Sequence, residues 1–178
     1  KRPVSNKAPN IPAEYSSTAA GYVSSVKNQG GTNACWAFAA VASAESNLLR
    51  KGLIKNGDDI SDLSEAHLVW FAHKSLTTDV DDPTFGDGAN VASPYSSGGD
   101  WHRSVYTIAR GSGFTLEKDY PFYPYNSTNM GNYDESKRYE SEATLNEAFL
   151  IPNESTDEIK KAVMEYGSVG IAYHSDHD

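Results

Sequence analysis

The sequence predicts an α+β fold that is mainly helical. Apolar side chains recur at helical spacing in four segments, and an apolar run with strand character, residues 169–173, follows the last of them. Capping residues and glycines mark the ends of these segments. A chain of 178 residues with 38% apolar composition can bury one domain-sized core, or supply part of something larger.

The chain opens with a segment that lacks any periodicity. Residues 1–28 carry Pro3, Pro9 and Pro12 among Ser, Thr and Ala, which predicts an extended arm.

The first helix is predicted over residues 34–50. Thr32 or Asn33 offers an N-cap, and Gly52 is placed to end the helix. The apolar positions expected on one face are Phe38, Val41, Ala42, Leu48 and Leu49. Cys35 therefore lies in the first helical turn.

A second helix is predicted over residues 65–74, with Ser64 as its cap. The polar stretch 75–97 that follows is too long for an ordinary connector, so we expect a surface insertion. Acidic residues within 79–88 have the oxygen ligands that calcium prefers, but not the spacing of an EF-hand loop. A solvated acidic turn is the favoured interpretation, and we predict no metal.

Two more helices and a strand complete the predicted elements. The third helix, 101–109, follows Gly98 and Gly99. The aromatic, proline-rich stretch 120–125 predicts an extended, packed segment. The fourth helix begins at a capping box, 155–158, and Gly167 ends it before the strand at 169–173.

Composition excludes several classes of function. The net charge of −9 argues against nucleic acid or an anionic membrane as the main partner, because both require clustered Lys and Arg. The longest apolar run, residues 68–72, is far shorter than the ~18 residues of a membrane span. A single cysteine excludes an internal disulfide, so packing must hold the fold.

That cysteine has the surroundings of a nucleophile. A helix N-terminus favours the thiolate, which is the reactive form of Cys35. Gln29 precedes it by six residues, and Gly30 and Gly31 allow a tight turn between them. The Gln29 side-chain amide and the Cys35 backbone N–H can then converge on the oxyanion of a tetrahedral intermediate. The alternative is that Gln29 is an ordinary loop amide and Cys35 a buried core thiol. The residues around Cys35 argue against this alternative.

At these residues the sequence resembles the papain-like cysteine peptidases. The likeness is carried by Val-Lys-Asn-Gln-Gly at 26–30 and Ala-Cys-Trp-Ala-Phe at 34–38. It continues in the family's order at residues 11–12, 63–65, 98–99, 120–122 and 167–172. The resemblance implies a papain-like fold. Residues 29–125 would be its helical left domain, with the insertion at 75–97, and residues 126–178 the start of its antiparallel right β-domain.

The resemblance also assigns roles to individual residues. Cys35 would be the nucleophile and Gln29 the oxyanion donor. Gly98 and Gly99 would leave room for the backbone of an extended peptide. Ala172 would face the S2 pocket, and so would Trp101, unless Trp101 is instead a core residue of its helix. Mature members of the family often begin near residue 11, so residues 1–10 would be a propeptide remnant.

Two departures from the family pattern stand out. The family usually has a disulfide that joins a cysteine three residues before the nucleophile to one just before the glycine pair. This chain has Thr32 and Ser96 at those positions. Such disulfide-free members resemble bacterial, particularly clostridial, surface peptidases, which implies a secreted or cell-surface location.

The second departure concerns the catalytic histidine and its asparagine partner. His174 and His177 fall within the sequence spacing expected after a papain-like cysteine. They directly follow the predicted strand, however, whereas the family's histidine lies on a later strand. We therefore expect the histidine and asparagine on a second chain or a C-terminal fragment. We expect His67, His73 and His102 to be solvated or half-buried residues of the helical domain.

These features predict a cysteine endopeptidase that hydrolyses polypeptides through an acyl-enzyme and needs no cofactor. Two alternatives remain open. One is a catalytically idle, papain-like adhesin or binding module, against which the presence of both Gln29 and Cys35 argues. The other is a cysteine-dependent transpeptidase or acyltransferase, which differs only in the acceptor.

Overall fold

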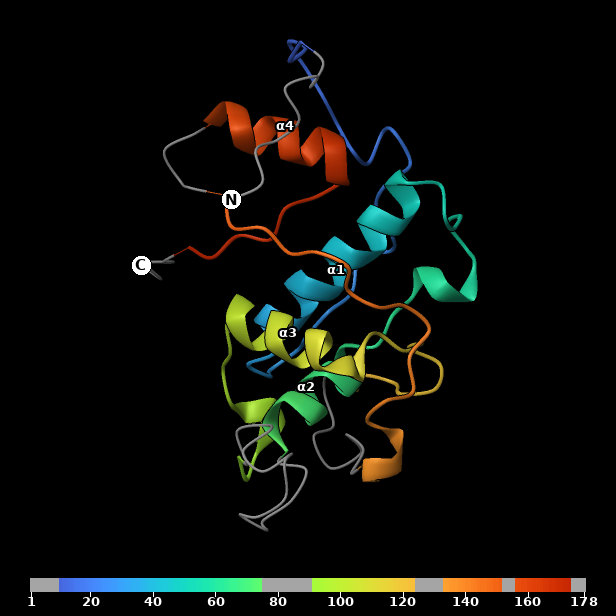
Figure 1. Ribbon diagram of the computed structural model, residues 1–178, viewed down its shortest axis with the longest axis vertical. Helices are drawn as coiled ribbons and strands as arrows, with labels where there is room; N and C mark the ends of the chain where they lie inside the picture. The colour runs from blue at the N-terminus through green and yellow to red at the C-terminus, as the bar shows by residue number, and fades with distance from the viewer. Residues whose placement is uncertain (1–9, 75–90, 124–132, 152–155, 174–178) are drawn as a thin grey trace.

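The structure, a computed structural model, describes residues 10–74, 91–123, 133–151 and 156–173. Its α-helices are α1 (Cys35–Arg50), α2 (Glu65–His73), α3 (Trp101–Thr107) and α4 (Thr156–Tyr166). Short helical turns are η1 (Asp59–Ser61), η2 (Pro94–Ser96), η3 (Ile108–Ser112) and η4 (Glu135–Lys137). Figure 1 shows α1 in the middle of the molecule, with α2 and α3 on one side and α4 on the other.

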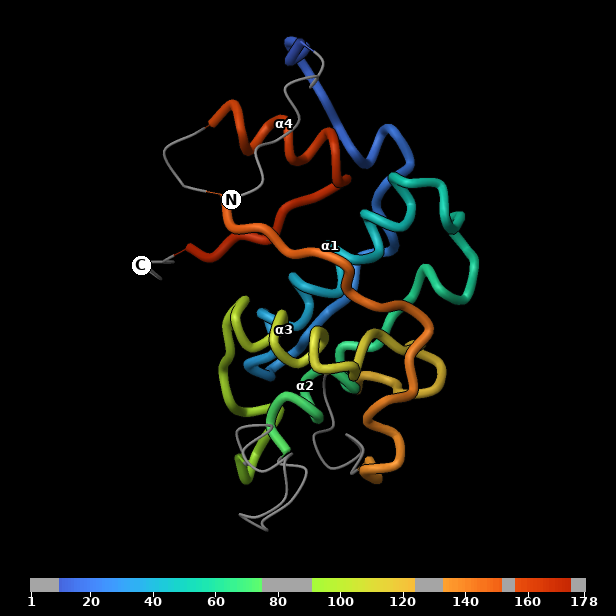
Figure 2. Tube along the Cα trace, viewed as in Figure 1, coloured from blue at the N-terminus to red at the C-terminus, as the bar shows by residue number. Residues whose placement is uncertain are grey.

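Helix α1 is the central element of the packing. It contacts α2, α3 and α4, and Figure 2 shows it between α4 and the pair α2 and α3. Its buried side chains include Trp36, Ala37, Val41 and Leu49. The main core joins α1 to α2, to the 114–116 segment and to Tyr95.

Helix α1 starts without the side-chain cap that the sequence predicts. The N-cap position is Ala34, and no side chain caps it. The prediction of Thr32 or Asn33 as cap is wrong, because both side chains are bonded to carbonyls outside the helix. The helix ends as predicted: Gly52 has φ 67° and donates its N–H to Leu49 O at 3.0 Å.

The buried face of α1 also differs from the predicted one. Ala42 is exposed, whereas Glu45 is buried on the same face as Val41 and Leu49. A glutamate holds that position because Lys27, the Ser24 hydroxyl and one backbone N–H bind its carboxylate. Leu63 N–H donates to Glu45 Oε1 at 2.7 Å.

Helix α2 is buried along its whole length. Ser64 caps it as predicted, since Ser64 Oγ accepts a hydrogen bond from His67 N at 3.0 Å. The segment 133–140 lies against it and is held by buried Arg138. That guanidinium donates to two backbone carbonyls near the helix end, Phe71 O and Lys74 O, each at 2.8 Å. Arg138 therefore serves as a C-terminal cap supplied from a distant segment.

Helix α3 is two residues shorter than the predicted 101–109. Asp100 Oδ1 caps its start by accepting from Arg103 N at 2.9 Å. The chain then widens into the π-turn η3 and turns away at Gly111 and Gly113, with φ of 110° and 59°. At Gly113 the positive φ combines with close packing, because a Cβ there would lie 2.5 Å from Ser141 Cβ.

Helix α4 spans the predicted residues and ends at Gly167, whose φ is 97°. Two α1 side chains bind its last carbonyls: Asn47 Nδ2 donates to Tyr166 O at 3.1 Å, and Arg50 Nε donates to Met164 O at 2.8 Å. The predicted capping residue Ser155 lies outside the described residues.

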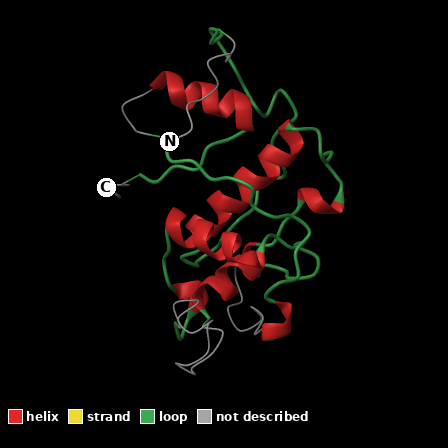
Figure 3. Cartoon of the chain, in the orientation of Figure 1, coloured by secondary structure: helices red, strands yellow, loops and turns green. Residues whose placement is uncertain are grey.

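The strand predicted at 169–173 is not formed in the structure. Residues 168–173 run without any ladder, and Figure 3 shows helices and loops but no strand among the described residues. A strand needs a hydrogen-bonded neighbour, and no described segment pairs with this one. Within the described residues, no helix is long and apolar enough to cross a membrane.

Candidate active site

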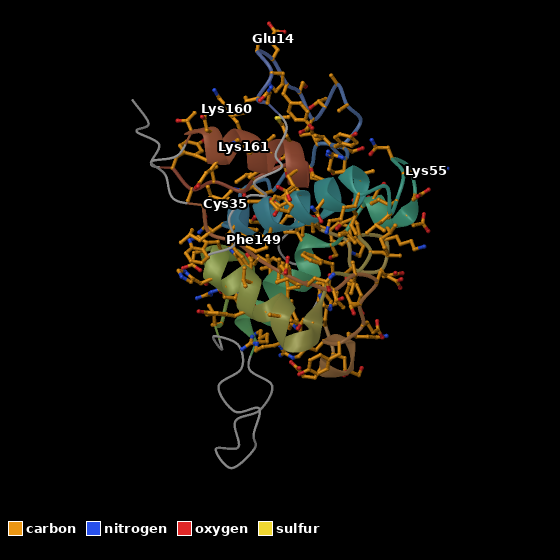
Figure 4. All side chains as sticks on the ribbon, turned by 45° about the horizontal axis from the view of Figure 1, so that its top comes forward. Glu14, Cys35, Lys55, Phe149, Lys160 and Lys161 are labelled. Carbon is orange, nitrogen blue, oxygen red and sulfur yellow. The ribbon has the colours of Figure 1, made fainter. Side chains whose placement is uncertain are left out.

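Cys35 is the first residue of α1, and its side chain is exposed. Figure 4 shows it at the N-terminal end of the α1 ribbon. Backbone N–H groups in the first turn of a helix have no partner within that helix and favour negative charge beside them. The Cys35 thiol is therefore open to solvent at a helix N-terminus.

Gln29 lies in a compact loop that leads into the helix. Its side-chain Nε2 donates to Thr32 O at 3.2 Å, and Thr32 Oγ1 donates back to Gln29 O at 2.9 Å. Gly30 turns the chain with φ 58°. An amide group has two N–H donors, and the bond to Thr32 uses one of them. The loop thus fixes the orientation of the Gln29 amide before any substrate is bound.

The two glycines of the 98–99 pair have different surroundings. A Cβ on Gly99 would lie 2.6 Å from Trp36 Cδ2 and Cε2, so the indole ring covers this glycine. A Cβ on Gly98 would meet nothing within 4 Å. The Trp36 ring therefore occupies the space that a side chain at position 99 would need. Gly98 borders open space instead.

Trp101 and Ala172, the predicted S2 residues, are both at the surface. Trp101 is 47% exposed and its ring stacks on His102, so it is not a core residue of α3. Ala172 is exposed as well, in the segment that follows α4. No described hydrogen bond or ring contact joins Trp101 to the Ala172 segment.

The segment that carries Ala172 runs along α1 toward its N-terminus. A Cβ on Gly167 would lie within 3.2 Å of Ser46 O and Arg50 Cβ. Three residues later, a Cβ on Gly170 would lie 3.6 Å from Ser43 Oγ and 3.9 Å from Ala39 Cβ. The chain therefore travels from the last turns of α1 to a point one turn from Cys35.

An ion cluster around Lys27, with Glu45 and Glu65 buried and Asp62 exposed, anchors the loop on its other side. Lys27 Nζ lies 3.0 Å from Glu45 Oε1, 3.1 Å from Glu65 Oε1 and 2.9 Å from Asp62 Oδ1. It also donates to Leu63 O at 2.5 Å. These contacts fix the backbone two residues before Gln29.

The charges in this cluster are strongly coupled. Burial works against a charge on Lys27, but the carboxylates of Glu65 and Glu45 outweigh it and raise the pKa of the ammonium group. Burial raises the pKa of Glu65, and the neighbouring Lys27 ammonium group works in the opposite direction. Sequence reasoning missed this cluster, although a glutamate on the apolar face of a helix, as at Glu45, is a signal that could have found it.

Comparison with known proteins decides the family. The family model described as papain family cysteine protease matches residues 11–178. The chain belongs to the papain family of cysteine proteases. The resemblance predicted from the sequence is confirmed.

Individual relatives agree with that assignment. Peptidase 1 of Psoroptes ovis is 34% identical over 116 residues, which cover 65% of this chain and 28% of the relative. The structure of digestive procathepsin L 3 from the Tenebrio molitor larval midgut matches with a TM-score of 0.63 and 20% identity, over 92% of this chain and 44% of that one. The predicted papain-like α+β fold is therefore confirmed.

A bacterial structure is similar too. The cysteine protease and lectin-like domains of Cwp84, a surface layer associated protein of Clostridium difficile, match with a TM-score of 0.58 and 23% identity. The match covers 86% of this chain and 30% of that one. The chain thus spans less than half the length of each of these three relatives. A clostridial branch of the papain family is consistent with this likeness and stays a prediction.

None of the histidines that the structure describes is bonded to Cys35. His67 and His73 are buried, and each is bonded to a backbone carbonyl. Burial lowers the pKa of His67 to about 4, and it also lowers the pKa of His73. His102 is exposed, with its Nδ1 3.7 Å from Asp100 Oδ2. Residues 174–178, which hold the other two, lie outside the described residues.

A metal site is not predicted for this chain, and the acidic stretch 79–88 lies outside the described residues. Within the described ranges, no group of three or more His, Cys, Asp and Glu side chains could hold a metal ion.

Proposed function

We propose that this chain supplies the nucleophile and the oxyanion donors of a cysteine endopeptidase. The observation that carries the proposal is the exposed Cys35 thiol at the start of α1, beside a loop that fixes the Gln29 amide. In the reaction, the thiolate attacks the carbonyl carbon of a peptide bond, and the Gln29 amide and the Cys35 N–H stabilise the oxyanion. The amine product leaves, and water then hydrolyses the thioester.

The substrate is proposed to be an extended polypeptide that runs past Gly98. The open space there lets a peptide backbone approach closely. Ala172 supports an S2 pocket near the nucleophile. Two extended residues beyond Gly170 add about 7 Å, roughly the distance along α1 from Ala39 back to Cys35. We propose that Ala172 and the exposed Trp101 ring border this pocket and favour an apolar P2 side chain.

The general base is proposed to come from outside these residues. None of the described histidines is bonded to Cys35, and His67 and His73 are committed to backbone carbonyls. A second chain or a C-terminal segment would contribute the histidine and its asparagine. It would also cover apolar side chains that are now exposed, such as Ile171 (72%) and Tyr173 (79%). The likeness to the surface layer associated Cwp84 supports a secreted or cell-surface location.

Labelling and hydrolysis of the full-length protein test this proposal. A thiol-directed epoxide inhibitor should modify Cys35, and the labelled enzyme should no longer cleave unstructured polypeptides. Cys35→Ala is the control for both readouts. If Cys35 stays unmodified in the folded protein, the nucleophile assignment is wrong.

Product analysis separates the alternatives. Hydrolysis products support an endopeptidase, whereas transfer to an added amine identifies an acyltransferase. A folded protein that reacts with no substrate is the result expected of an idle binding module. Residues 1–178 should be inactive when produced alone. Activity of that piece would make His174 or His177 the base.

A further inference from the structure

One peptide group connects the two halves of the proposed site. The peptide unit between Thr32 and Asn33 accepts a hydrogen bond on one side, because Gln29 Nε2 donates to Thr32 O at 3.2 Å. On the other side it donates one, from Asn33 N to Tyr95 O at 3.0 Å. The orientation of this single planar group thus affects both the Gln29 amide and the segment that leads to Gly98.

The Asn33 side chain makes a second bond to that same segment. Asn33 Nδ2 donates to Ser96 O at 2.7 Å. Tyr95, the neighbouring residue, is buried at 7% exposure, and its hydroxyl reaches Ala66 O on α2. Asn33 therefore holds the loop at two consecutive residues of a segment that is itself fixed to the core.

These two bonds occupy the place where the family's disulfide is absent. Thr32, at one of the two cysteine positions, uses its hydroxyl within its own loop, on Gln29 O. Ser96, at the other, contributes its backbone carbonyl and not its hydroxyl to the bond with Asn33. In the described residues, the polar side chain that bridges the two segments is that of Asn33.

We propose that Asn33 is a positioning residue that aligns the Gln29 amide with the Gly98 segment. This inference rests on the proposed function, because it assigns the residue that sets the geometry of the oxyanion donor. The backbone N–H of Asn33 holds the 32–33 peptide on Tyr95 O, and the side-chain bond to Ser96 O keeps the two segments in place for that contact. The Thr32 carbonyl of that peptide in turn directs one N–H of Gln29, which leaves the other oriented toward the reacting carbonyl.

Kinetic measurements distinguish this positioning role of Asn33 from a simple contribution to stability. Loss of one hydrogen bond of this kind should lower kcat by about fivefold to tenfold, with KM little changed, because the bond acts on a donor used in the transition state. Asn33→Asp keeps the shape of the side chain but replaces the donor with an acceptor that faces Ser96 O. Asn33→Ala removes the donor without adding a charge.

A double-mutant cycle with Gln29→Ala tests the connection directly. If Asn33 acts through Gln29, neither Asn33 variant should lower kcat further once Gln29 is alanine. The matched control is Asn56→Asp, the same change at a distant loop residue whose Nδ2 donates to Gly21 O and Val23 O. It should leave kcat unchanged.

An NMR measurement, which does not depend on catalysis, tests the role of Asn33 separately from the proposed function. The Gln29 side-chain amide resonances in the full-length protein can be assigned by their absence from the Gln29→Ala spectrum. They should shift in Asn33→Asp and Asn33→Ala and stay in place in Asn56→Asp. An inactive wild-type enzyme defeats the proposed function. Gln29 resonances unmoved in both Asn33 variants, or kcat losses that add to that of Gln29→Ala, overturn the role of Asn33.

Discussion

Substitution of the two neighbouring glycines by alanine should have opposite effects. Neither Gly98 nor Gly99 has a φ in the left-handed region, so alanine is compatible with the backbone at both positions. Space alone distinguishes them. A Cβ on Gly99 would lie 2.6 Å from two carbon atoms of the Trp36 ring, whereas one on Gly98 has no neighbour within 4 Å.

The magnitude follows from that contact. Carbon atoms pack at about 3.5–4.0 Å, so the indole or the 98–99 backbone has to move by roughly 1 Å. The indole is 6% exposed and its ring lies edge-on to His73, 5.5 Å away, so it has little room to retreat. Overpacking of this kind costs about 1–3 kcal/mol. We expect Gly99→Ala to lower the free energy of unfolding by that amount.

Gly98→Ala is the matched control. It restricts the unfolded chain without a clash, so stability should stay the same or rise by about 0.4–1 kcal/mol. Urea unfolding followed by tryptophan fluorescence measures both variants. If peptides bind past Gly98, its alanine variant should also raise KM while the fold stays intact. Equal unfolding midpoints for the two variants would refute the assignment of the Gly99 space to Trp36.

Three further predictions concern other parts of the structure. Gln29→Ala should lower kcat by roughly 10²–10³ with little change in KM, because its amide acts on the oxyanion; steady-state kinetics that show a loss in KM alone would contradict this. His67 has a pKa lowered by burial to about 4, from an unfolded value near 6.5, so stability should fall as the pH drops through that range, by at most ~1.4 kcal/mol per pH unit. His67→Gln should flatten this dependence in unfolding midpoints measured against pH, and a parallel curve would argue against it. Arg138→Met removes the donor to Phe71 O and should lower the free energy of unfolding by about 2–4 kcal/mol in urea. Lys137→Met, an exposed neighbour, should stay within about 0.5 kcal/mol, and an equal loss in both would exclude this cap.

Local signals in the sequence predicted most of the helical elements. The Ser64 cap and Gly167 each act within one helical turn, so they can be recognised without knowledge of the fold. The position of Cys35 at the start of α1 follows from the same periodicity. The strand at 169–173 was predicted on apolar character alone, and it is absent because pairing depends on a neighbouring segment.

The sequence by itself determined the family, the helices and the candidate nucleophile with its glutamine, because these depend on short motifs and local spacing. Only the tertiary structure decided what surrounds them. Lys27 and Glu45 are 18 residues apart, and Asn33 and Ser96 are separated by 63 residues, yet each pair is in hydrogen-bond contact. The two glycines at 98–99 are chemically identical in the sequence, and the Trp36 ring is what distinguishes them. Long-range contacts of this kind arise when the helices pack, so no local pattern encodes them.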